Sequence, residues 1–350
     1  MLVILSALLS VQTMAYKILI LTDHLTHTKE NSLYVLANEL KKHSLVAQLD
    51  IASRGNTDNH DFFYAMNSYE LKVASPTKKI KFQQSGKQFL SHTNTRSLIE
   101  YDFVFLRLPR PIPLGFFHFL GRYFDEQHII NRPSGILETS NKSFLLQVEH
   151  LCPPIRLCRT MTEVWEFQRK FPIVLKPLED YGGKGIVKVK DNFVYHGKEV
   201  QALFTYEHEL QKQLDRGGYL AMKFMKNVGQ GDKRVVVVNG KVLGASLRLP
   251  PEGSWLCNAS QGGSSHETIA DEQERWMAEE LHKVLAPKGI GIFGMDTLVD
   301  DDGKRILSEV NTLSIGGIKQ IQKQSKTPIV EQTAHELMQF AIQQIETVQT

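Results

Sequence analysis

The chain has 350 residues, enough for two or three domains, and its 42% hydrophobic and 23% charged content is typical of a globular protein. A net charge of +3 without a dense Lys/Arg block argues against a nucleic-acid partner. Three cysteines cannot form a disulfide framework and lack metal-site spacing, which indicates free thiols in a reducing compartment.

The N-terminal segment up to Tyr16 is uncharged, but it lacks the basic stretch that begins a secretory signal. It is also shorter than the roughly 20 apolar residues of a membrane span. A second start at Met14 leads directly into an apolar strand pattern from Lys17. We therefore expect residues 1–13 to be an over-extended start and the protein to be cytoplasmic, without a membrane partner.

The first third of the chain combines strand patterns with one helical pattern. Strand, helix and strand in this order indicate an open parallel sheet. Ligands of such sheets lie beyond the carboxyl ends of the strands, which is where Asp23 and Arg107 fall. The predicted strands are 17–22, 46–51, 71–73, 80–82 and 102–107, and the predicted helix is 32–42.

A boundary is predicted near Asn131-Arg132-Pro133, and strand patterns dominate after it. Asn239-Gly240 is a strong signal for a two-residue turn within a hairpin over 234–249. The other predicted elements are a capped helix start at 140–146, strands at 173–177, 220–224, 292–299 and 305–311, and helices at 272–285 and 330–345.

The last predicted hairpin carries three oxygen side chains. If its turn has an even number of residues, Asp296 lies opposite Leu307, and Glu309 and Asn311 follow at two-residue spacing on the same face. Two carboxylates and a carboxamide that converge in this way suit Mg²⁺, which prefers oxygen ligands.

Two lysines and a glycine-rich turn are candidate phosphate ligands. Lys176 ends an apolar strand and Lys142 opens a helix, and a lysine binds phosphate as a compact point charge. Gly182 and Gly183 would let backbone amides approach a phosphate group. The sequence contains neither a Walker A motif nor a Rossmann glycine motif, which excludes the two common nucleotide-binding scaffolds.

In their order along the chain, these features resemble the ATP-grasp superfamily and, within it, the bacterial glutathione synthetases. The likeness extends from about Lys17 to the C-terminus. The matching stretches are Arg107 with the prolines after it, Asn131-Arg-Pro, Asn141-Lys142, Val174-Leu-Lys-Pro-Leu178, Tyr181-Gly-Gly183, Gly231-Asp-Lys-Arg234, Arg248-Leu-Pro250, Asn258, Gly262-Gly263, Gly294-Met-Asp296 and Glu309-Val-Asn-Thr-Leu-Ser314.

The resemblance implies an α/β and α+β protein with an ATP-grasp fold and an N-terminal parallel-sheet domain. The implied parts are a substrate-side domain at 14–130, a lid subdomain at 131–218 and a large subdomain with the metal site at 219–350. The implied activity is an ATP-dependent carboxylate–amine ligase that forms an acyl phosphate. Its partners would be small amino-acid or peptide substrates, with a homo-oligomer as a further option.

The resemblance also implies a role for each candidate residue. ATP would be bound by Lys142, Lys176, Gly182, Gly183, Met222, Lys223 and Phe224, under a lid at 180–187. Mg²⁺, or Mn²⁺ in its place, would be bound by Asp296, Glu309 and Asn311. Arg234 and Arg248 would be catalytic, because they would stabilise charge on the transferring phosphoryl group. The substrate would be bound by Arg107, Asn258 and Ser314.

The segment 255–267 departs from the glutathione synthetase pattern. Leu256 and Ser264 stand where that pattern has arginines, and Trp255 adds an apolar surface. We therefore expect γ-glutamylcysteine to be a poor substrate. The alternatives are a different dipeptide product, glutamate addition to a protein or cofactor, or a non-catalytic ATP-binding regulatory protein such as the synapsins.

Overall fold

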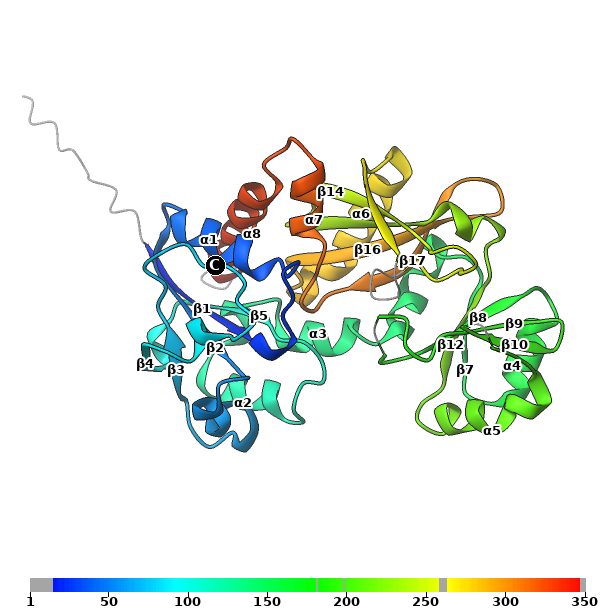
Figure 1. Ribbon diagram of the computed structural model, residues 1–350, viewed down its shortest axis with the longest axis horizontal. Helices are drawn as coiled ribbons and strands as arrows, with labels where there is room; N and C mark the ends of the chain where they lie inside the picture. Colours follow the sequence, from blue (N-terminus) through cyan, green and yellow to red (C-terminus); the bar gives the residue numbers. More distant parts are fainter. Residues whose placement is uncertain (1–14, 181, 198, 258–262, 347–350) are drawn as a thin grey trace, which may run out of the picture.

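The computed structural model describes residues 15–180, 182–197, 199–257 and 263–346. Three sheets follow one another along the long axis of the molecule (Figure 1). We call them sheet A (β4-β3-β2-β1-β5-β6), sheet B (β11-β10-β9-β8-β12-β7) and sheet C (β15-β14-β13-β16-β17). In the described part of the chain, no helix has the length and apolar character needed to cross a membrane.

Sheet A has a parallel centre and an antiparallel edge. β1 pairs in parallel with β2 and β5, and β3 and β4 form an antiparallel hairpin beside β2. The register places Thr22 beside both Ser53 and Arg107, so the carboxyl ends of three strands meet, as predicted. The bounds are Tyr16–Thr22 (β1), Val46–Ser53 (β2), Glu70–Ala74 (β3), Thr93–Ser97 (β4), Phe103–Arg107 (β5), Ile129–Ile130 (β6), Leu33–Lys42 (α1) and Phe116–Tyr123 (α2).

The strand predicted at 80–82 is wrong. The side chain of Asn38 accepts a hydrogen bond from the Ile80 amide (2.9 Å) and donates one to the Ile80 carbonyl (2.8 Å). Ile80 therefore needs no neighbouring strand to satisfy its backbone, and its side chain packs against the core with Phe82. The outer strand is instead β4, a polar segment without the apolar alternation that would reveal a strand.

Sheet B is antiparallel throughout and is covered by two helices (Figure 1). Apolar residues of α4 and α5 pack against β8 and β9 and form a separate core. The strands predicted at 173–177 and 220–224 are confirmed. The bounds are Ile155–Cys158 (β7), Ile173–Pro177 (β8), Val187–Lys190 (β9), Phe193–His196 (β10), Glu199–Ala202 (β11), Tyr219–Lys223 (β12), Met161–Gln168 (α4) and Leu203–Leu214 (α5).

Sheet C is also antiparallel and contains the two predicted hairpins. Asn239 and Gly240 have φ angles of 48° and 75°, so both adopt the left-handed conformation of a type I′ turn. The predicted strands and helices of this region are confirmed. The bounds are Asp232–Val238 (β13), Lys241–Leu249 (β14), Ser264–Thr268 (β15), Ile292–Val299 (β16), Arg305–Asn311 (β17), Glu272–Leu285 (α6), Ile318–Gln324 (α7) and Ile329–Glu346 (α8).

The register predicted for β16 and β17 is wrong, although its consequence holds. Val299 pairs with Arg305, so the turn has an odd number of residues. An irregularity between Asp296 and Thr297 then shifts the pairing, and Asp296 lies directly opposite Glu309 instead of Leu307. Opposed residues share a face, so the two carboxylates still lie on the same face of the sheet.

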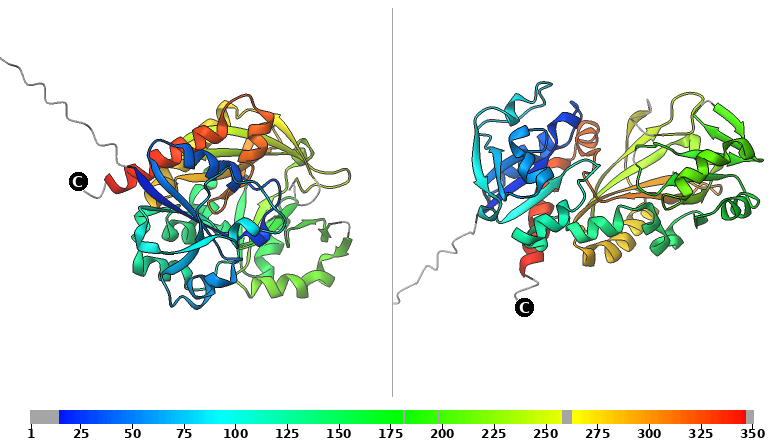
Figure 2. Two further views of the ribbon diagram at one scale, coloured as in Figure 1. Left: turned by 60° about the vertical axis from the view of Figure 1, so that its left-hand side comes forward. Right: turned by 90° about the horizontal axis from the view of Figure 1, so that it is seen from below.

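A buried asparagine joins sheet A to sheet C. Asn131 follows β6 directly; its Oδ1 accepts from the amides of Gly291 and Ile292, and its Nδ2 donates to the carbonyls of Ile292 and Thr312. The chain then continues through α3 (Pro133–Thr139) and the 3-10 helix η7 (Lys142–Leu151) towards sheet B. α8 lies beside α1, and the two helices share a hydrophobic core (Figure 2). The division into 14–130, 131–218 and 219–350 remains a proposal. It assigns β12 to the last part, whereas β12 hydrogen-bonds within sheet B.

Candidate active site

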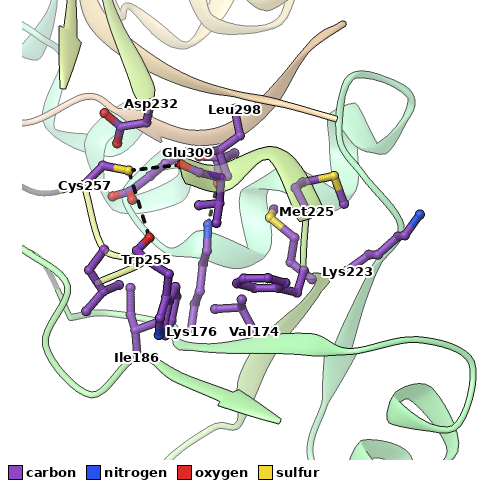
Figure 3. Close-up of a pocket in the computed structure, with 15 residues that line it drawn as sticks. Val174, Lys176, Ile186, Lys223, Met225, Asp232, Trp255, Cys257, Leu298 and Glu309 are labelled. Atoms are coloured by element: carbon purple, nitrogen blue, oxygen red, sulfur yellow. Dashed lines mark hydrogen bonds between the residues drawn. The ribbon is translucent and has the colours of Figure 1, made fainter. Parts of the chain in front are cut away.

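A pocket between sheets B and C, called here the inter-sheet pocket, contains most of the predicted nucleotide-binding residues (Figure 3). Its space measures about 610 Å³ when the open mouth is included. Apolar side chains such as Val174 and Leu298 line it together with charged ones. The predicted site residues in its lining are Lys176, Met222, Lys223, Phe224 and Glu309.

The two predicted phosphate-binding lysines are buried near one carboxylate. Lys176 on β8 donates to the carbonyl of Ser308 (2.9 Å), and Lys142 at the start of η7 donates to the carbonyl of Asp180. Burial lowers the pKa of both ammonium groups, and the charge of Glu309 acts in the opposite direction. Lysine ammonium groups placed close together suit a ligand with several negative charges, such as phosphate.

The predicted glycine turn follows β8 directly. Gly182, Gly183 and Gly185 all have positive φ angles, between 66° and 79°. A Cβ atom on Gly185 would lie 2.9 Å from the ring of Pro177, so glycine is required there for space as well as for conformation. The turn therefore starts beside Lys176 and contacts Lys142 through Asp180.

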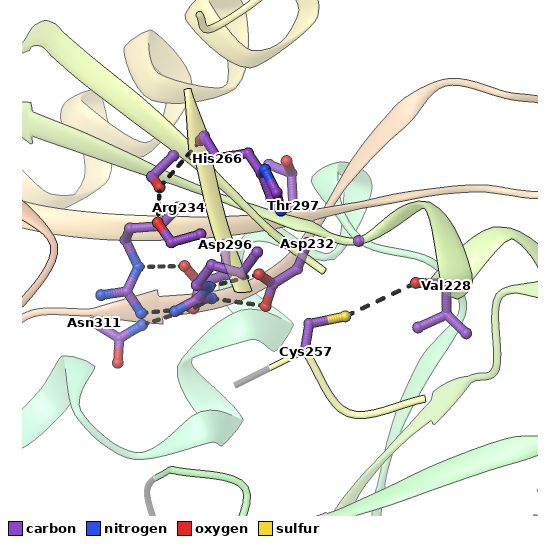
Figure 4. A network of polar contacts seen from close by, with 12 residues as sticks. Val228, Asp232, Arg234, Cys257, His266, Asp296, Thr297 and Asn311 are labelled. Carbon is purple, nitrogen blue, oxygen red and sulfur yellow. Dashed lines mark hydrogen bonds and ion pairs between the residues drawn. The ribbon is translucent and has the colours of Figure 1, made fainter. Parts of the chain in front are cut away.

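Arg234 and Arg248 both bind Asp296 (Figure 4). Arg234 contacts both oxygens of Asp296, through Nε and through Nη2 (2.8 Å). Arg248 contacts Asp296 at 3.0 Å and binds Asp232 with Nε (2.6 Å) and Nη2 (2.7 Å). Burial alone would raise the pKa of Asp296, but the two guanidinium groups hold it below its ordinary range. The network therefore keeps Asp296 ionised.

The oxygen side chains of Asp296, Glu309 and Asn311 fit a divalent cation. Asp296 and Glu309 are opposed on neighbouring strands, and Asn311 donates to Asp296 Oδ2 at 3.4 Å. Among the described residues, no hydrogen bond or salt bridge engages the Glu309 carboxylate, although it is half-buried in the pocket lining. The same part of the chain contains no cluster of three His, Cys, Asp or Glu residues. A metal here would thus need the Asn311 carboxamide as its third protein ligand.

Arg107 lies at the carboxyl end of β5, and no salt bridge joins it to an anionic group among the described residues. The residue is 6% exposed, and its Nε and Nη1 are buried without a hydrogen bond in the same part of the chain. Burial lowers the pKa of Arg107 to about 10. Ser314 donates to the neighbouring carbonyl of Leu108 (2.7 Å), so two of the predicted substrate residues lie at one place. Asn258 lies outside the described residues.

Sequence reasoning gave no role to two charged residues that shape these sites. Asp232 lines the inter-sheet pocket, and its place in the Gly231-Asp-Lys-Arg234 stretch was the signal available. Arg54 binds Asp23 (2.9 Å) and donates to the carbonyls of Pro109 and Pro111, and so holds the loop after Arg107. No local pattern marks Arg54. Trp255 and Leu256, expected beside the substrate, line the inter-sheet pocket.

The three sheets and the inter-sheet pocket have the arrangement of the ATP-grasp fold. The solved structure of D-cycloserine synthetase DcsG superposes with a TM-score of 0.64 at 13% identity, covering 93% of this chain and 99% of that one. The ADP complex of N5-carboxyaminoimidazole ribonucleotide synthetase superposes with a TM-score of 0.56 at 15% identity, covering 93% and 78%. At these identities the likeness shows the fold alone.

The family profile described as "Prokaryotic glutathione synthetase, ATP-grasp domain" matches residues 141–326, more than half of the chain. The chain belongs to this family and is an ATP-dependent carboxylate–amine ligase. The glutathione synthetase of Brucella melitensis is 28% identical over 67% of this chain and 72% of its own length. That of Mesorhizobium japonicum is 26% identical over 75% and 82%. Such ligases use ATP with a divalent cation.

Proposed function

We propose that the chain binds ATP in the inter-sheet pocket and joins a small amino-acid or peptide carboxylate to an amine. The observation that carries this proposal is that one pocket combines apolar walls with a buried lysine, Lys176, and a carboxylate, Glu309, that makes no hydrogen bond or salt bridge among the described residues. Apolar walls suit a purine, whereas the charged end suits phosphates and a cation.

The substrate carboxylate would attack the γ-phosphate of ATP, which gives an acyl phosphate and ADP. The amine would then attack the acyl carbon and release phosphate and a proton. Lys142 and Lys176 would hold phosphate oxygens, while Arg234 and Arg248 would stabilise the charge that spreads over the transferring group. No protein nucleophile is needed, so the protein acts by positioning and by excluding water.

Asp296, Glu309 and Asn311 would hold Mg²⁺, for which Mn²⁺ can substitute. The supporting observation is the donor chemistry: hard oxygen ligands on two paired strands, one of them the Glu309 carboxylate, which makes no hydrogen bond or salt bridge within the described part of the chain. When bound, the cation would orient the phosphates and neutralise their charge.

Arg107 would bind a carboxylate of the substrate. A buried guanidinium without an anion is costly, and a ligand carboxylate would supply the missing partner with charge-assisted hydrogen bonds. Ser314, which lies within contact of the same loop, would line this site. The site is formed from sheet A and from the segment after β17, so it lies at the junction that Asn131 holds together.

The carboxylate substrate would differ from γ-glutamylcysteine. Leu256 lines the inter-sheet pocket, and Ser264 pairs with Leu249 at the start of β15, where its hydroxyl contacts His266 (2.8 Å). Because Leu256 lies at the pocket proposed for ATP, Ser264 is the position that bears on the substrate. An arginine missing from the substrate site removes a charge-assisted hydrogen bond of about 1.5–3 kcal/mol, or roughly one to two decades in affinity.

The test is a product screen that measures ADP release with a panel of amino acids and dipeptides, with hydroxylamine added to trap the acyl phosphate as a hydroxamate. We expect carboxylate-dependent ADP release and a weak response to γ-glutamylcysteine plus glycine. If γ-glutamylcysteine gives the highest kcat/KM, at about 10⁴ M⁻¹s⁻¹ or more, the substrate proposal is wrong. If no carboxylate stimulates ADP release, the proposed site chemistry is wrong.

A further inference from the structure

The loop between β14 and β15 brings an indole ring into the inter-sheet pocket. Trp255 is half-buried and lines the pocket together with Lys176 and Phe224. The rings of Trp255 and Phe224 meet edge to face, with centroids 5.8 Å apart and planes at 78°. Figure 3 shows Trp255 beside Ile186, on the side of the pocket away from Lys223. Aromatic and aliphatic side chains thus lie together in the lining of the pocket.

The loop is attached to the segment that follows β12. Cys257 is buried, and its thiol donates to the carbonyl of Val228 (3.8 Å) in the 3-10 helix η8 (Lys226–Gln230). Within the loop, the Ser254 hydroxyl accepts from the Leu256 amide (3.1 Å). These contacts on both sides of Trp255 hold the indole at the pocket.

The indole is part of the pocket wall. Trp255 shares the lining of the inter-sheet pocket with Lys176, Glu309 and Leu298. An aromatic face stacks well on a nucleobase, since every base has a π-face, and the effect does not depend on hydrogen bonds.

We propose that Trp255 contacts the purine of ATP and is a nucleotide-binding residue of this enzyme. The inference rests on the proposed function of the inter-sheet pocket. It gives the loop at 250–257 a role at the nucleotide, distinct from the substrate contact expected from its position in the sequence.

The test compares ATP dissociation constants, measured by isothermal titration calorimetry, for the intact protein and its variants. Trp255→Ala should weaken ATP binding by about tenfold to one-hundredfold, the range expected for loss of base stacking. Trp255→Phe, which keeps an aromatic ring, should stay within about fivefold. Trp276→Ala, at an exposed position of α6, is the matched control and should bind as the wild type does.

A fluorescence experiment needs no change at Trp255. Replacing Trp165 and Trp276 by phenylalanine leaves Trp255 as the single tryptophan, and ATP should then change its emission with the dissociation constant found by calorimetry. Unchanged emission at saturating ATP, or ATP binding by Trp255→Ala that is as tight as or tighter than that of the wild type, would overturn the inference while the pocket assignment stands. Absence of ATP binding by the wild type would instead overturn the proposed function.

Discussion

At the scale of single residues, several buried charges form ion pairs within the described chain, whereas others at the proposed ligand sites do not. Arg54 is paired with Asp23, and Lys233 with the fully buried Glu274 (2.7 Å). Arg107 and Glu309 are not paired in this way within the described chain, although neither is fully exposed. Because an unpaired buried charge is costly, such groups are expected where a ligand completes the site.

Glu309→Gln should lower turnover about a hundredfold or more and raise the Mg²⁺ concentration needed for activity, because one hard ligand and one negative charge are lost. Two measurements test this. The first is kcat as a function of Mg²⁺ concentration, and the second is the binding of Mn²⁺, followed by electron paramagnetic resonance. Glu280→Gln, which removes a surface carboxylate paired with Lys283 and outside the lining of the inter-sheet pocket, is the control. Near-normal turnover of Glu309→Gln at limiting Mg²⁺ would show that the metal assignment is wrong.

Arg107→Met should raise KM for the carboxylate substrate about tenfold to one-hundredfold. It should also increase the free energy of unfolding of the ligand-free protein by about 1 kcal/mol, because the variant no longer buries an unpaired cation. Arg54→Met is the control with the opposite sign: it leaves Asp23 buried without its cation and should cost about 3–5 kcal/mol. Denaturant titration and steady-state kinetics measure both effects, and destabilisation of Arg107→Met would contradict the argument.

His27 should make stability depend on pH. Burial first, and then the charge of Arg107, lower its pKa from 6.5 to about 4. Between these values the unfolded chain binds more protons than the folded one, so this contribution is complete above about pH 6.5 and is lost as the pH falls towards 4. His27→Gln has no such group, so the difference in unfolding free energy between wild type and variant should shrink across that window. A difference that stays constant from pH 7 to pH 4 would contradict this.

At the scale of elements, the final hairpin shows what a sequence pattern can and cannot determine. Its two strands were predicted with their observed bounds, since both are apolar and flank an Asp-Gly turn. Their register was not, because an odd turn and an irregularity beside Thr297 each shift the pairing and together return Asp296 to the face of Glu309. Irregularities of this kind depend on tertiary packing, here including the Ser308 carbonyl that binds Lys176.

The elements that sequence reasoning missed are those whose signals are weak or whose partners are distant. β4 is polar because it is an outer strand of sheet A, and the apolar segment 80–82 is held by Asn38, about forty residues earlier in the chain. Lys142 and Lys176 could be identified because each stands at the end of an element. Arg54 and Trp255 could not be assigned in the same way, since their contacts are made by loops whose path only the fold determines.

At the scale of the whole molecule, three sheets each supply one part of the proposed reaction. Sheets B and C enclose the inter-sheet pocket, sheet C also carries the paired carboxylates, and sheet A supplies Arg107. The fold could be recognised from the order of motifs along the chain, whereas the way in which the sheets are fixed to each other could not. Asn131 was visible only as part of a motif, and its role depends on residues about 160 positions later.

Asn131→Ala should lower the free energy of unfolding by about 3 kcal/mol or more. It leaves four buried backbone groups without partners, namely the amides of Gly291 and Ile292 and the carbonyls of Ile292 and Thr312, and each such group costs about 1–3 kcal/mol, not fully additively. Denaturant titration measures the loss, and Asn94→Ala at an exposed position of β4 is the control, with an expected change within about 0.5 kcal/mol.

The same substitution should impair ligation more than nucleotide binding. Thr312 lies between Asn311 and the segment that leads to Ser314, so loss of its bond to Asn131 loosens the side of the active site that faces sheet A. The inter-sheet pocket is formed by sheets B and C and does not include Asn131. We therefore expect a raised KM for the carboxylate substrate with an ATP dissociation constant within about threefold of the wild type. Equal losses in both, in protein that is still folded, would mean that Asn131 supports the whole molecule and not specifically the junction of sheets A and C.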